Sequence, residues 1–420
     1  MSVHTDTLLD VEDLHVYFRT DTGENVRAVD GVSFQVQPGK TTAIVGESGS
    51  GKTVTSEAIT QLFPSPPGYI PEGSVTLDGQ DLTEISDDEM RSVRGGKISH
   101  IFQNPQGALN PVYTVGWQIR EAVMLHQDVS KTEANERAVE LMTQVGIPEA
   151  STRLDDYPHE FSGGQKQRVI IAMALACEPD LLIADEPTTA LDVTIQAQIL
   201  NLLKELQEER DMAMLFITHD LGVVAEVADR VVVMYAGKVM ERGGVFDVFE
   251  RPSHPYTRAL LDCLPGRGDG AGSIGGRLPS PTDPPAGCRF HPRCDHAVDA
   301  CREGEQPPDH AVDDDDDHVV SCVHYEPGGD PSVVRGRGER GGVRPVVAFA
   351  DEWRLDNADL SDVLGKALDL RLTLPLIRFV NRYLARIDCC EFGGRHFDLP
   401  PRVKPSAPNT STNRTRDRPD

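Results

Sequence analysis

The residues best suited to chemistry stand in the run GESGSGKT at positions 46–53. The run fits the phosphate-binding loop pattern: a glycine, any four residues, a second glycine, a lysine, then serine or threonine. Glycines let successive backbone N–H groups turn toward one anion, and the start of the following helix adds a partial positive charge. Lys52 is placed to reach the β- and γ-phosphates, and the Thr53 hydroxyl to bind Mg²⁺. This run therefore predicts a nucleotide site.

Polar residues also follow three short apolar runs. Two acids come after LLIA, where we expect Asp185 to hold hydrated Mg²⁺ and Glu186 to accept a proton from attacking water. His219 follows the run AMLFI, and beside a phosphate loop we interpret it as a contact to the γ-phosphate. Gln103 ends the run ISHIF, where it is also compatible with an ordinary capping group.

A second anion-binding helix end is predicted at Ser162–Gln165. Ser162 is a favourable N-cap, and the paired glycines behind it leave backbone N–H groups free at the helix start. One interpretation is a capped helix that simply follows a loop. The other is a site for a phosphate that is bound elsewhere.

The elements that must position these residues follow from hydrophobic periodicity. The apolar run Thr41–Val45 predicts a buried strand before the phosphate loop, and Val54–Phe63 predicts the helix after it. Residues 8–37 predict an antiparallel pair of strands, with Phe18 at its turn placed to stack on a purine ring. From about residue 106 to 160 the pattern is helical, which indicates a helical insert in an α/β sheet.

Composition limits the partners. The chain of 420 residues has a formal net charge of −26. Residues 331–420 hold 16 Lys and Arg against 12 Asp and Glu, so the acidic surplus lies in the first 330 residues. Such a surface repels nucleic acid, and we expect none as a direct ligand. It also suggests a salt-rich cytosol, in which screening reduces the repulsion between acidic groups.

The sequence shows no run of the roughly 18 apolar residues that a membrane span needs. Its N-terminus has no basic segment followed by an apolar one, as a secretion signal would. We therefore expect a cytoplasmic protein whose contact with a membrane comes through partner subunits.

Taken together, these motifs resemble the ATP-binding subunit of an ABC transporter over roughly residues 8–262. The resemblance implies an α/β fold: a P-loop NTPase (RecA-like) ABC ATPase core with an antiparallel β subdomain and an inserted helical subdomain. We expect the ATP-binding domain at 1–262, with its helical subdomain at about 104–165. A small Cys-rich C-terminal segment at 263–327 and an Arg/Gly/Pro-rich tail at 328–420, largely disordered or with short helices, complete the prediction.

The resemblance also implies the roles of single residues. Those expected to bind ATP are Phe18, Gly46, Glu47, Ser48, Gly49, Ser50, Gly51, Lys52, Thr53, Ser162, Gly163, Gly164, Gln165 and Asp192. Those expected to act in catalysis are Glu186, His219 and Gln103, and those expected to bind Mg²⁺ are Thr53, Gln103 and Asp185. In this family two subunits form a head-to-tail dimer, and each ATP lies between one phosphate loop and the other subunit's Ser162–Gln165.

A narrower resemblance is to the dipeptide and oligopeptide importer ATPases. It rests on NPQGALNPVYTVG (104–116), YPHEFSGGQKQR (157–168), HPYTRALL (254–261) and the cysteine-bearing residues 287–326. It implies peptide as the substrate, although nickel and oligosaccharide importers share these marks. The implied partners are a second, identical or homologous ATPase, two membrane permeases and an extracellular solute-binding protein, with this chain at the cytoplasmic face. A soluble ABC ATPase of translation or DNA repair is the competing class.

Four cysteines stand in a segment rich in proline and glycine: Cys288, Cys294, Cys301 and Cys322. Disulfides are disfavoured in the cytosol, and thiolates converging on a metal would order such a segment. Zinc sites usually pair cysteines two to four residues apart, and no such pair is present here. The spacing and the family resemblance favour a [4Fe–4S] cluster, with zinc or metal-free thiols as alternatives.

The aspartate run 313–317 predicts a solvated loop. In the tail, residues 360–387 are compatible with one or two amphipathic helices broken at Pro375. The adjacent cysteines at 389 and 390 are interpreted as bystanders rather than ligands.

Overall fold

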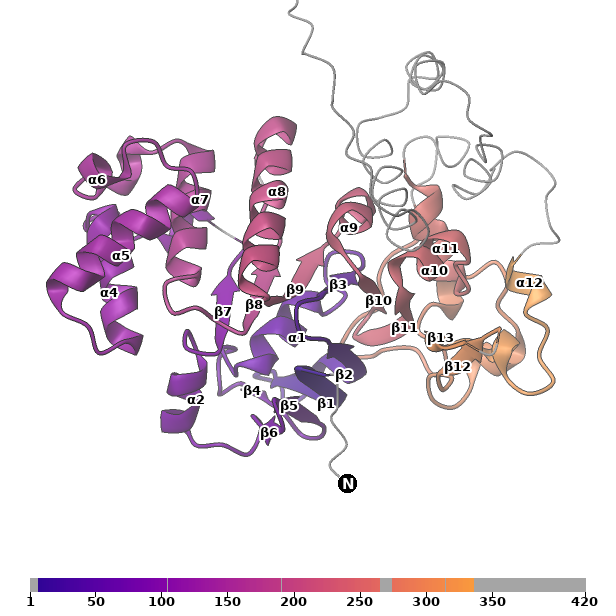
Figure 1. Cartoon of the computed structure of the whole chain (residues 1–420). Coiled ribbons are helices and arrows are strands. Elements are labelled where there is room, and N and C mark those ends of the chain that lie inside the picture. The colour runs from indigo at the N-terminus through magenta and orange to yellow at the C-terminus, as the bar shows by residue number, and fades with distance from the viewer. Residues whose placement is uncertain (1–6, 104, 190, 265–273, 314, 336–420) are drawn as a thin grey trace, which may run out of the picture. The chain divides into compact units, whose positions relative to one another are not determined.

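The computed structural model describes residues 7–103, 105–189, 191–264, 274–313 and 315–335 (Figure 1). The chain divides into two compact units, 1–369 and 370–420, and the second lies outside the described residues. The helices expected within 360–387 and the cysteines at 389 and 390 lie outside them as well.

The larger sheet carries the loops with the predicted chemistry. In the described part of the chain its eight strands follow the spatial order β12 (His310–Val312), β13 (Asp315–Val320), β11 (Lys238–Gly244), β10 (Arg230–Tyr235), β3 (Thr41–Val45), β9 (Ala213–Thr218), β8 (Leu181–Asp185) and β7 (Ile98–Ile101). Neighbours from β10 to β7 pair in parallel. Strands β11, β13 and β12 extend the sheet by antiparallel pairing.

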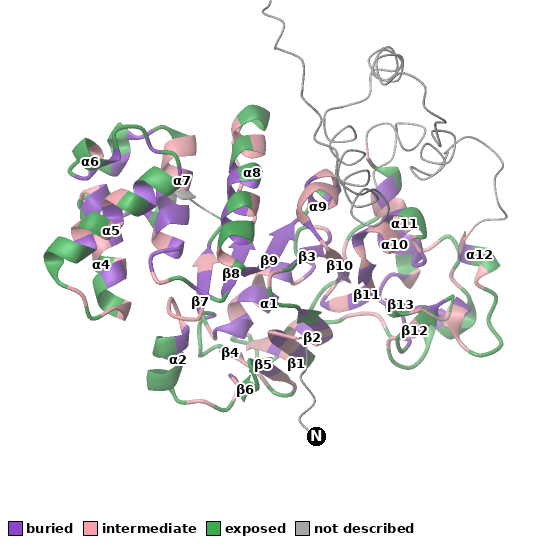
Figure 2. Cartoon of the chain, viewed as in Figure 1, coloured by how far each residue is buried: buried purple, intermediate pink, exposed green. Residues whose placement is uncertain are grey.

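Strands β3, β8 and β9 are buried along their whole length (Figure 2). A parallel sheet is covered on both faces, so its strands consist of continuous apolar runs. Ile44, Ile183 and Leu215 belong to one hydrophobic cluster, while Leu182 and Phe216 belong to another. Burial of both faces fixes the strand ends, and thus the loops that leave them.

Helices cover this sheet: α1 (Lys52–Ile59), α7 (Gly163–Ala174), α8 (Val193–Arg210), α9 (Leu221–Val227), α10 (Val245–Glu250) and α11 (Pro255–Asp262). The helix expected at 54–63 begins two residues earlier, because Gly51 is its N-cap. It ends at Ile59, since Gln61 is left-handed with φ 51°. Among the described helices, none is both long and apolar enough to cross a membrane.

A smaller antiparallel sheet lies against α1. Its strands are β2 (Asn25–Val36), β1 (Leu9–Arg19), β5 (Ser74–Leu77) and β6 (Gln80–Asp81), with β4 (Gly68–Tyr69) paired to β1. This confirms the antiparallel pair expected within residues 8–37. Val11, Leu14 and Val16 of β1 join Ile44 in one core, so the two sheets share a hydrophobic interior.

The helical insert consists of short helices rather than one long one. They are α3 (Pro105–Ala108), α4 (Val115–His126), α5 (Lys131–Gln144), α6 (Ala150–Arg153) and the 3₁₀ turn η1 (Pro158–Glu160). Helix α2 (Asp87–Val93) precedes the insert and contributes Met90 and Val93 to the core shared with the smaller sheet. Ser130 divides the pattern, because its side chain and that of Glu133 form a capping box that starts α5. Helices α4 and α5 pack beside α7, and α6 packs against α5 (Figure 1).

The C-terminal segment packs on the ATPase core and has only a small hydrophobic cluster of its own, made of Val312, Val320, Cys322 and Val334. Besides β12 and β13 it contains η2 (His291–Arg293), η3 (Asp299–Arg302), η4 (Val323–Tyr325) and α12 (Ser332–Arg335). Cys288, Phe290 and Cys301 share a hydrophobic cluster with Tyr235 and Tyr256 of the core. Because the segment has few apolar residues, it buries several of them against the ATPase core.

The segment differs from expectation in two details. Its packed part runs past residue 327, since Arg258 donates to the carbonyl of Val334, which is buried, in α12. The aspartate run is also more than a solvated loop, because Asp315–Asp317 begin β13. Asp313 pairs with Arg335 at 2.6 Å, and this arginine partner offsets the charge repulsion at the start of the strand.

Candidate active site

The carboxyl ends of four neighbouring parallel strands meet at one edge of the larger sheet. The phosphate loop follows β3, Asp185 ends β8, His219 follows β9 and Gln103 follows β7. Parallel strands all end at the same edge, which is where open α/β sheets bind ligands. The topology therefore brings together residues that are more than a hundred positions apart in the sequence.

Close backbone packing explains two glycines of the phosphate loop. A Cβ on Gly51 would overlap the carbonyl oxygen of Ala28, and one on Gly46 would overlap that of Met234. Gly51 also has φ 104°, a conformation that side chains disfavour. The loop thus lies directly against β2 and β10, and its N–H groups lead into the start of α1.

Lys52 is buried above this loop. Its Nζ donates to the carbonyl oxygens of Gly46 at 2.8 Å and Glu47 at 2.9 Å. Burial lowers the pKa of Lys52, while the nearby carboxylates of Glu186 and Asp185 raise it. The loop carbonyls take two of the three ammonium N–H donors, and this holds the charge beside the cradle.

Glu186 accepts hydrogen bonds from three groups. Gln103 Nε2 and Thr189 Oγ1 each lie 2.9 Å from its Oε2, and His219 Nδ1 lies 2.8 Å from its Oε1. Burial raises the pKa of Glu186, but the hydrogen bonds from His219, Thr189 and Gln103 outweigh it and lower the pKa. The carboxylate is therefore ionised near neutral pH and fixed in orientation.

Asp185 offers a site for a hard cation. It is 4% exposed, and within the described residues its Oδ1 has no hydrogen-bond partner. Burial raises the pKa of Asp185, whereas a hydrogen bond from the Thr53 hydroxyl lowers it. A buried carboxylate oxygen beside a threonine hydroxyl fits the oxygen ligands that Mg²⁺ prefers. The structure thus brings together two of the three predicted magnesium ligands, while the Gln103 amide bonds to Glu186.

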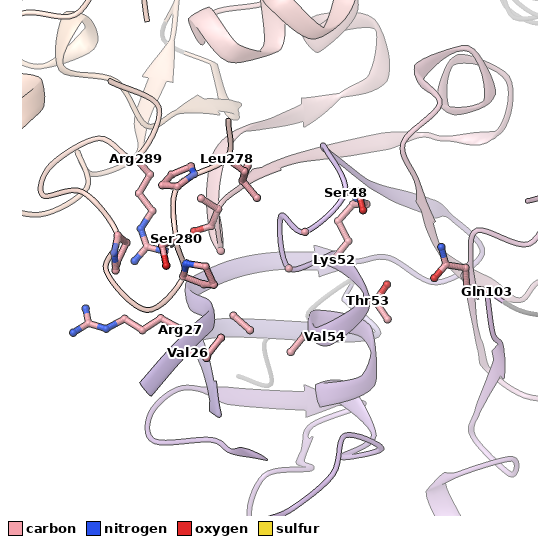
Figure 3. Close-up of a pocket in the computed structure, with 18 of the residues that line it drawn as sticks. Val26, Arg27, Ser48, Lys52, Thr53, Val54, Gln103, Leu278, Ser280 and Arg289 are labelled. Carbon is pink, nitrogen blue, oxygen red and sulfur yellow. Dashed lines mark hydrogen bonds between the residues drawn. The ribbon is translucent and has the colours of Figure 1, made fainter. Parts of the chain in front are cut away.

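A pocket of about 210 Å³ opens over the phosphate loop (Figure 3). Its walls come from β2, the phosphate loop, the ends of β7 and β8, and the C-terminal segment. The lining residues are Val26, Arg27, Ala28, Ser48, Gly49, Gly51, Lys52, Thr53, Val54, Gln103, Glu186, Ala236, Gly237, Leu278, Pro279, Ser280, Pro281, Pro284 and Arg289. Gln103 lies on one side of the phosphate loop in Figure 3, and Leu278 and Arg289 lie on the other.

Phe18 does not line this pocket. Its ring packs edge-on against Phe63 at a centroid distance of 6.0 Å, and it joins the core under the smaller sheet. The pocket wall holds Val26 and residues 278–281 instead. No sequence pattern links the proline-rich segment to the phosphate loop, so these residues were missed. The assignment of Phe18 to the purine stays a prediction.

The structure does not bring Ser162–Gln165 or Asp192 to the phosphate loop of the same chain. Ser162 starts α7 as part of a capping box with Gln165, and Asp192 caps α8 by accepting from the Ile195 N–H at 2.9 Å. Gly164 lies against α8, where a Cβ would stand 2.7 Å from a methyl group of Ile195. None of these residues lines the pocket.

The four predicted cysteine ligands cluster. Burial, together with charges on the other cysteines of the group, raises the pKa of Cys288 and of Cys322 to about 12. Burial and the neighbouring Cys301 also raise the pKa of Cys294. Every one of the four cysteines is thus close enough to the other three to affect a pKa. In the described ranges, however, no three of the four sulfurs lie within 4.8 Å of one another. The four side chains therefore lie in one region, but their sulfurs are not in contact as a set.

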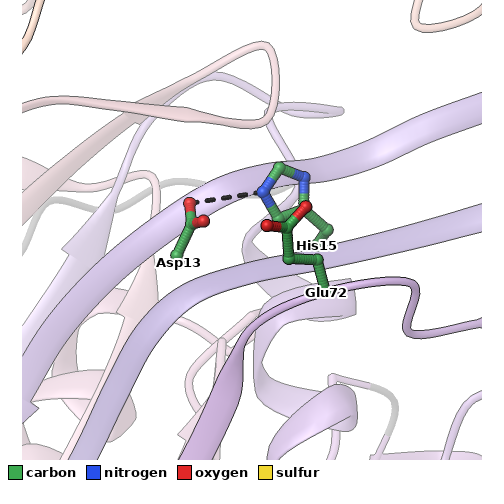
Figure 4. Close-up of side chains that lie close together, drawn as sticks. All are labelled: Asp13, His15 and Glu72. Carbon is green, nitrogen blue, oxygen red and sulfur yellow. Dashed lines mark hydrogen bonds and ion pairs between the residues drawn. The ribbon is translucent and has the colours of Figure 1, made fainter.

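A further cluster of polar side chains lies on the smaller sheet (Figure 4). His15 Nε2 lies 3.2 Å from Asp13 Oδ1, and Glu72 lies close to both residues. The other ring nitrogen, Nδ1, is 3.1 Å from Asp30. Because Asp13 and Glu72 are exposed and His15 already has two carboxylate partners, we interpret the cluster as a surface ion-pair network.

Two family descriptions match the chain. Residues 29–189 match the model described as ABC transporter. Residues 240–301 match the model described as oligopeptide/dipeptide transporter, C-terminal region. The first contains the phosphate loop, Ser162–Gln165 and Glu186, and the second contains three of the four clustered cysteines.

Curated relatives and solved structures are also similar. The oligopeptide transport ATP-binding protein OppD of Bacillus subtilis is 53% identical over 305 residues, covering 71% of this chain and 85% of that protein. The dipeptide transport ATP-binding protein DppD of the same organism is 49% identical over 333 residues, covering 78% and 98%. A dimeric ATP-binding cassette, MJ0796, bound to ADP and Pi is 29% identical with a TM-score of 0.51, covering 56% of this chain and 98% of that one.

Gly51→Ala tests the close packing of the phosphate loop, with Gly79→Ala as its control. Both glycines have positive φ, but no atom lies within 4 Å of a Cβ at Gly79. Gly79→Ala should lose about 1–2 kcal/mol of stability from backbone strain alone, and Gly51→Ala should lose more because its Cβ also overlaps the Ala28 carbonyl oxygen. Only Gly51→Ala should also lose ATP affinity, by at least tenfold in calorimetric titration. Equal ATP affinity in the two variants would contradict this account of the loop.

Proposed function

Because this chain belongs to the family of ATP-binding proteins of oligopeptide and dipeptide ABC transporters, we propose that it hydrolyses ATP to power peptide import. The observation that carries the proposal is the carboxylate of Glu186, which His219, Thr189 and Gln103 orient beside the phosphate loop. A fixed, ionised carboxylate next to a phosphate cradle is the arrangement that hydrolysis of the terminal phosphate needs.

In the proposed reaction, Lys52 and the backbone N–H groups of the loop hold the β- and γ-phosphates. Glu186 accepts a proton from water as the water oxygen bonds to the γ-phosphorus and the bond to the β-phosphate oxygen breaks. His219 contacts an oxygen of the γ-phosphate, as the sequence predicts. Asp185 and Thr53 would hold Mg²⁺, which neutralises charge on the phosphates when bound. Products are ADP and inorganic phosphate.

We propose that each reaction centre needs a second ATPase subunit, identical or homologous. Ser162–Gln165 offers a capped helix N-terminus but does not line the pocket of its own chain. A head-to-tail partner would bring its own copy of this segment to the γ-phosphate, where N–H donors stabilise negative charge. Val193, next to Asp192, is 81% exposed, which fits a position inside such an interface. ATP would close the dimer and hydrolysis would reopen it.

We also propose two membrane permeases as partners, docked on the helical insert at the cytoplasmic face. Large apolar side chains are exposed there: Phe102, Val112, Tyr113, Trp117, Met124, Leu125 and Tyr157. Tyr113 and Trp117 stack with centroids 4.0 Å apart, which makes a rigid aromatic patch. An extracellular solute-binding protein would deliver the substrate to the permeases.

Peptide is the substrate that the names of the relatives support. Nickel or oligosaccharide import by the same machinery would require a different set of permease partners. Nothing in the names of the relatives favours a soluble ATPase of translation or DNA repair. Uptake of labelled di- and oligopeptides by cells with and without this chain would test the assignment.

We propose that Cys288, Cys294, Cys301 and Cys322 hold a [4Fe–4S] cluster. A tetrahedral zinc ion with Zn–S bonds of 2.3 Å would bring its sulfurs to about 3.8 Å from one another. No three of these sulfurs are within 4.8 Å of one another in the described part of the chain. An iron–sulfur core spreads its four thiolates further apart, so the open arrangement supports it over a single ion.

Glu186→Gln tests the catalytic assignment. The amide keeps the shape of the side chain and one of its two accepting oxygens but cannot take a proton, so the ATPase rate should fall at least 100-fold. ATP binding should persist and hold the dimer closed, which sedimentation with ATP would detect. As a control, Glu205→Gln on the exposed face of α8 should leave the rate unchanged. An undiminished rate in Glu186→Gln would overturn the role of this residue.

Anaerobic purification tests the cysteine group. The full chain should be brown and contain about four iron atoms, as the [4Fe–4S] formula requires. Cys301→Ser should lose this iron, while Cys177→Ser, outside the group, should keep it. A colourless protein with one zinc ion, or with no metal, would refute the cluster.

We further propose that the acidic surplus is an adaptation to a salt-rich cytosol. Repulsion among surface carboxylates destabilises the compact state, and salt screens it. The melting temperature should therefore fall as salt is removed from the buffer. An unchanged melting temperature would count against the adaptation.

A further inference from the structure

The C-terminal segment reaches the phosphate loop through one arginine. Arg293 in η2 forms two parallel hydrogen bonds to Glu47, with Nη1–Oε2 at 2.9 Å and Nη2–Oε1 at 3.0 Å. The Arg293 side chain is 5% exposed, so this forked ion pair is well shielded from water. Glu47 lies inside the phosphate loop itself. A residue nearly 250 positions away in the sequence thus neutralises the negative charge within the anion cradle.

The same guanidinium also holds the stretch of chain that begins at residue 274. Arg293 Nε donates to the carbonyl of Gly275 at 2.7 Å, and Nη2 donates to that of Ile274 at 2.8 Å. From the opposite side, the Glu47 N–H donates to the Tyr256 hydroxyl at 2.9 Å. Arg293 therefore joins the phosphate loop to the start of the wall segment, which we define as residues 274–281.

The wall segment forms one side of the pocket over the loop (Figure 3). A methyl group of Leu278 lies 3.4 Å from the place where a Cβ on Gly49 would stand. Pro281 accepts a hydrogen bond from the Arg27 N–H at 2.9 Å, which fixes the segment to β2. Its Leu278, Pro279 and Pro281 face a pocket that Val26 also lines. This is an apolar surface of the kind that a nucleotide base requires.

We propose that the C-terminal segment completes the nucleotide site: Leu278–Pro281 form the wall against which the base packs, and Arg293 positions and neutralises the phosphate loop through Glu47. The proposal rests on the proposed ATP binding and adds the residues that determine its strength. Arg293 acts through Glu47, so it is a positioning residue. Leu278 is a specificity-determining contact to the base.

Charge gives Arg293 a measurable role. Without its guanidinium, the Glu47 carboxylate would stand unpaired beside the incoming triphosphate and repel it. The loss should therefore affect any polyphosphate, with or without a base. The wall makes a different prediction. The apolar Leu278 side chain offers neither charge nor a hydrogen bond to a polyphosphate, so its loss should mainly weaken a ligand that carries a base.

The test is calorimetric titration of the full chain with ATP·Mg²⁺ and with tripolyphosphate, which lacks the base. Arg293→Met should weaken both ligands about tenfold, and adding Glu47→Gln should recover most of the tripolyphosphate affinity by removing the unpaired charge. Leu278→Ala should weaken ATP about threefold to tenfold and tripolyphosphate less than twofold. Arg242→Met, which breaks the pair with Asp309 in the same segment, is the matched control and should bind both as wild type does.

The proposal is overturned if Arg293→Met and Leu278→Ala bind both ligands as tightly as the Arg242→Met control. It is also overturned if Glu47→Gln recovers nothing, because a structural brace alone would not respond to that charge. Should Arg293→Met fail to fold, Arg293→Lys keeps one charge without the fork and should show an intermediate affinity. Absence of ATP binding by the wild-type chain would instead refute the proposed function, so the two failures are distinguishable.

Discussion

The structure depends on one constraint: adjacent parallel strands must end at the same level. The sheet places four parallel strands side by side: β3, β9, β8 and β7. The residues that follow these strands therefore lie close together in space. Burial of both faces of the sheet fixes this register, and the Glu186 carboxylate can then be reached from three loops. A slip of one strand would separate Lys52 from Asp185 and Glu186. The chemistry of the site is thus a consequence of packing in the core.

The C-terminal segment extends this principle beyond the ATPase core. It adds strands to the same sheet through β13 and packs Phe290 against Tyr235 and Tyr256. From that position Arg289 pairs with Asp30 and Arg293 pairs with Glu47. Each of these arginines directly precedes or follows one of the clustered cysteines, so whatever orders the cysteine group also orders two contacts to the nucleotide pocket.

The sequence predicted what local patterns encode. The phosphate loop, the acidic pair at 185–186 and the buried strands are continuous in the chain, and the structure contains them with shifts of a few residues. Contacts between distant segments could not be predicted this way. Arg293 and Leu278 lie in a stretch without hydrophobic periodicity, and only the folded core brings them to Glu47 and Gly49. The purine contact predicted for Phe18 stays a prediction, because its ring packs edge-on against Phe63 and does not line the pocket.

The central claim is that each reaction centre is divided between two subunits. The most direct measurement mixes two inactive chains, one with Lys52→Ala and one with Ser162→Arg and Gly164→Asp, and follows ATP hydrolysis. Each chain alone should be nearly inactive, and an equal mixture should regain about a quarter of the wild-type rate, because half of its dimers hold one intact centre. Wild-type hydrolysis by the Ser162→Arg/Gly164→Asp chain alone would contradict the account.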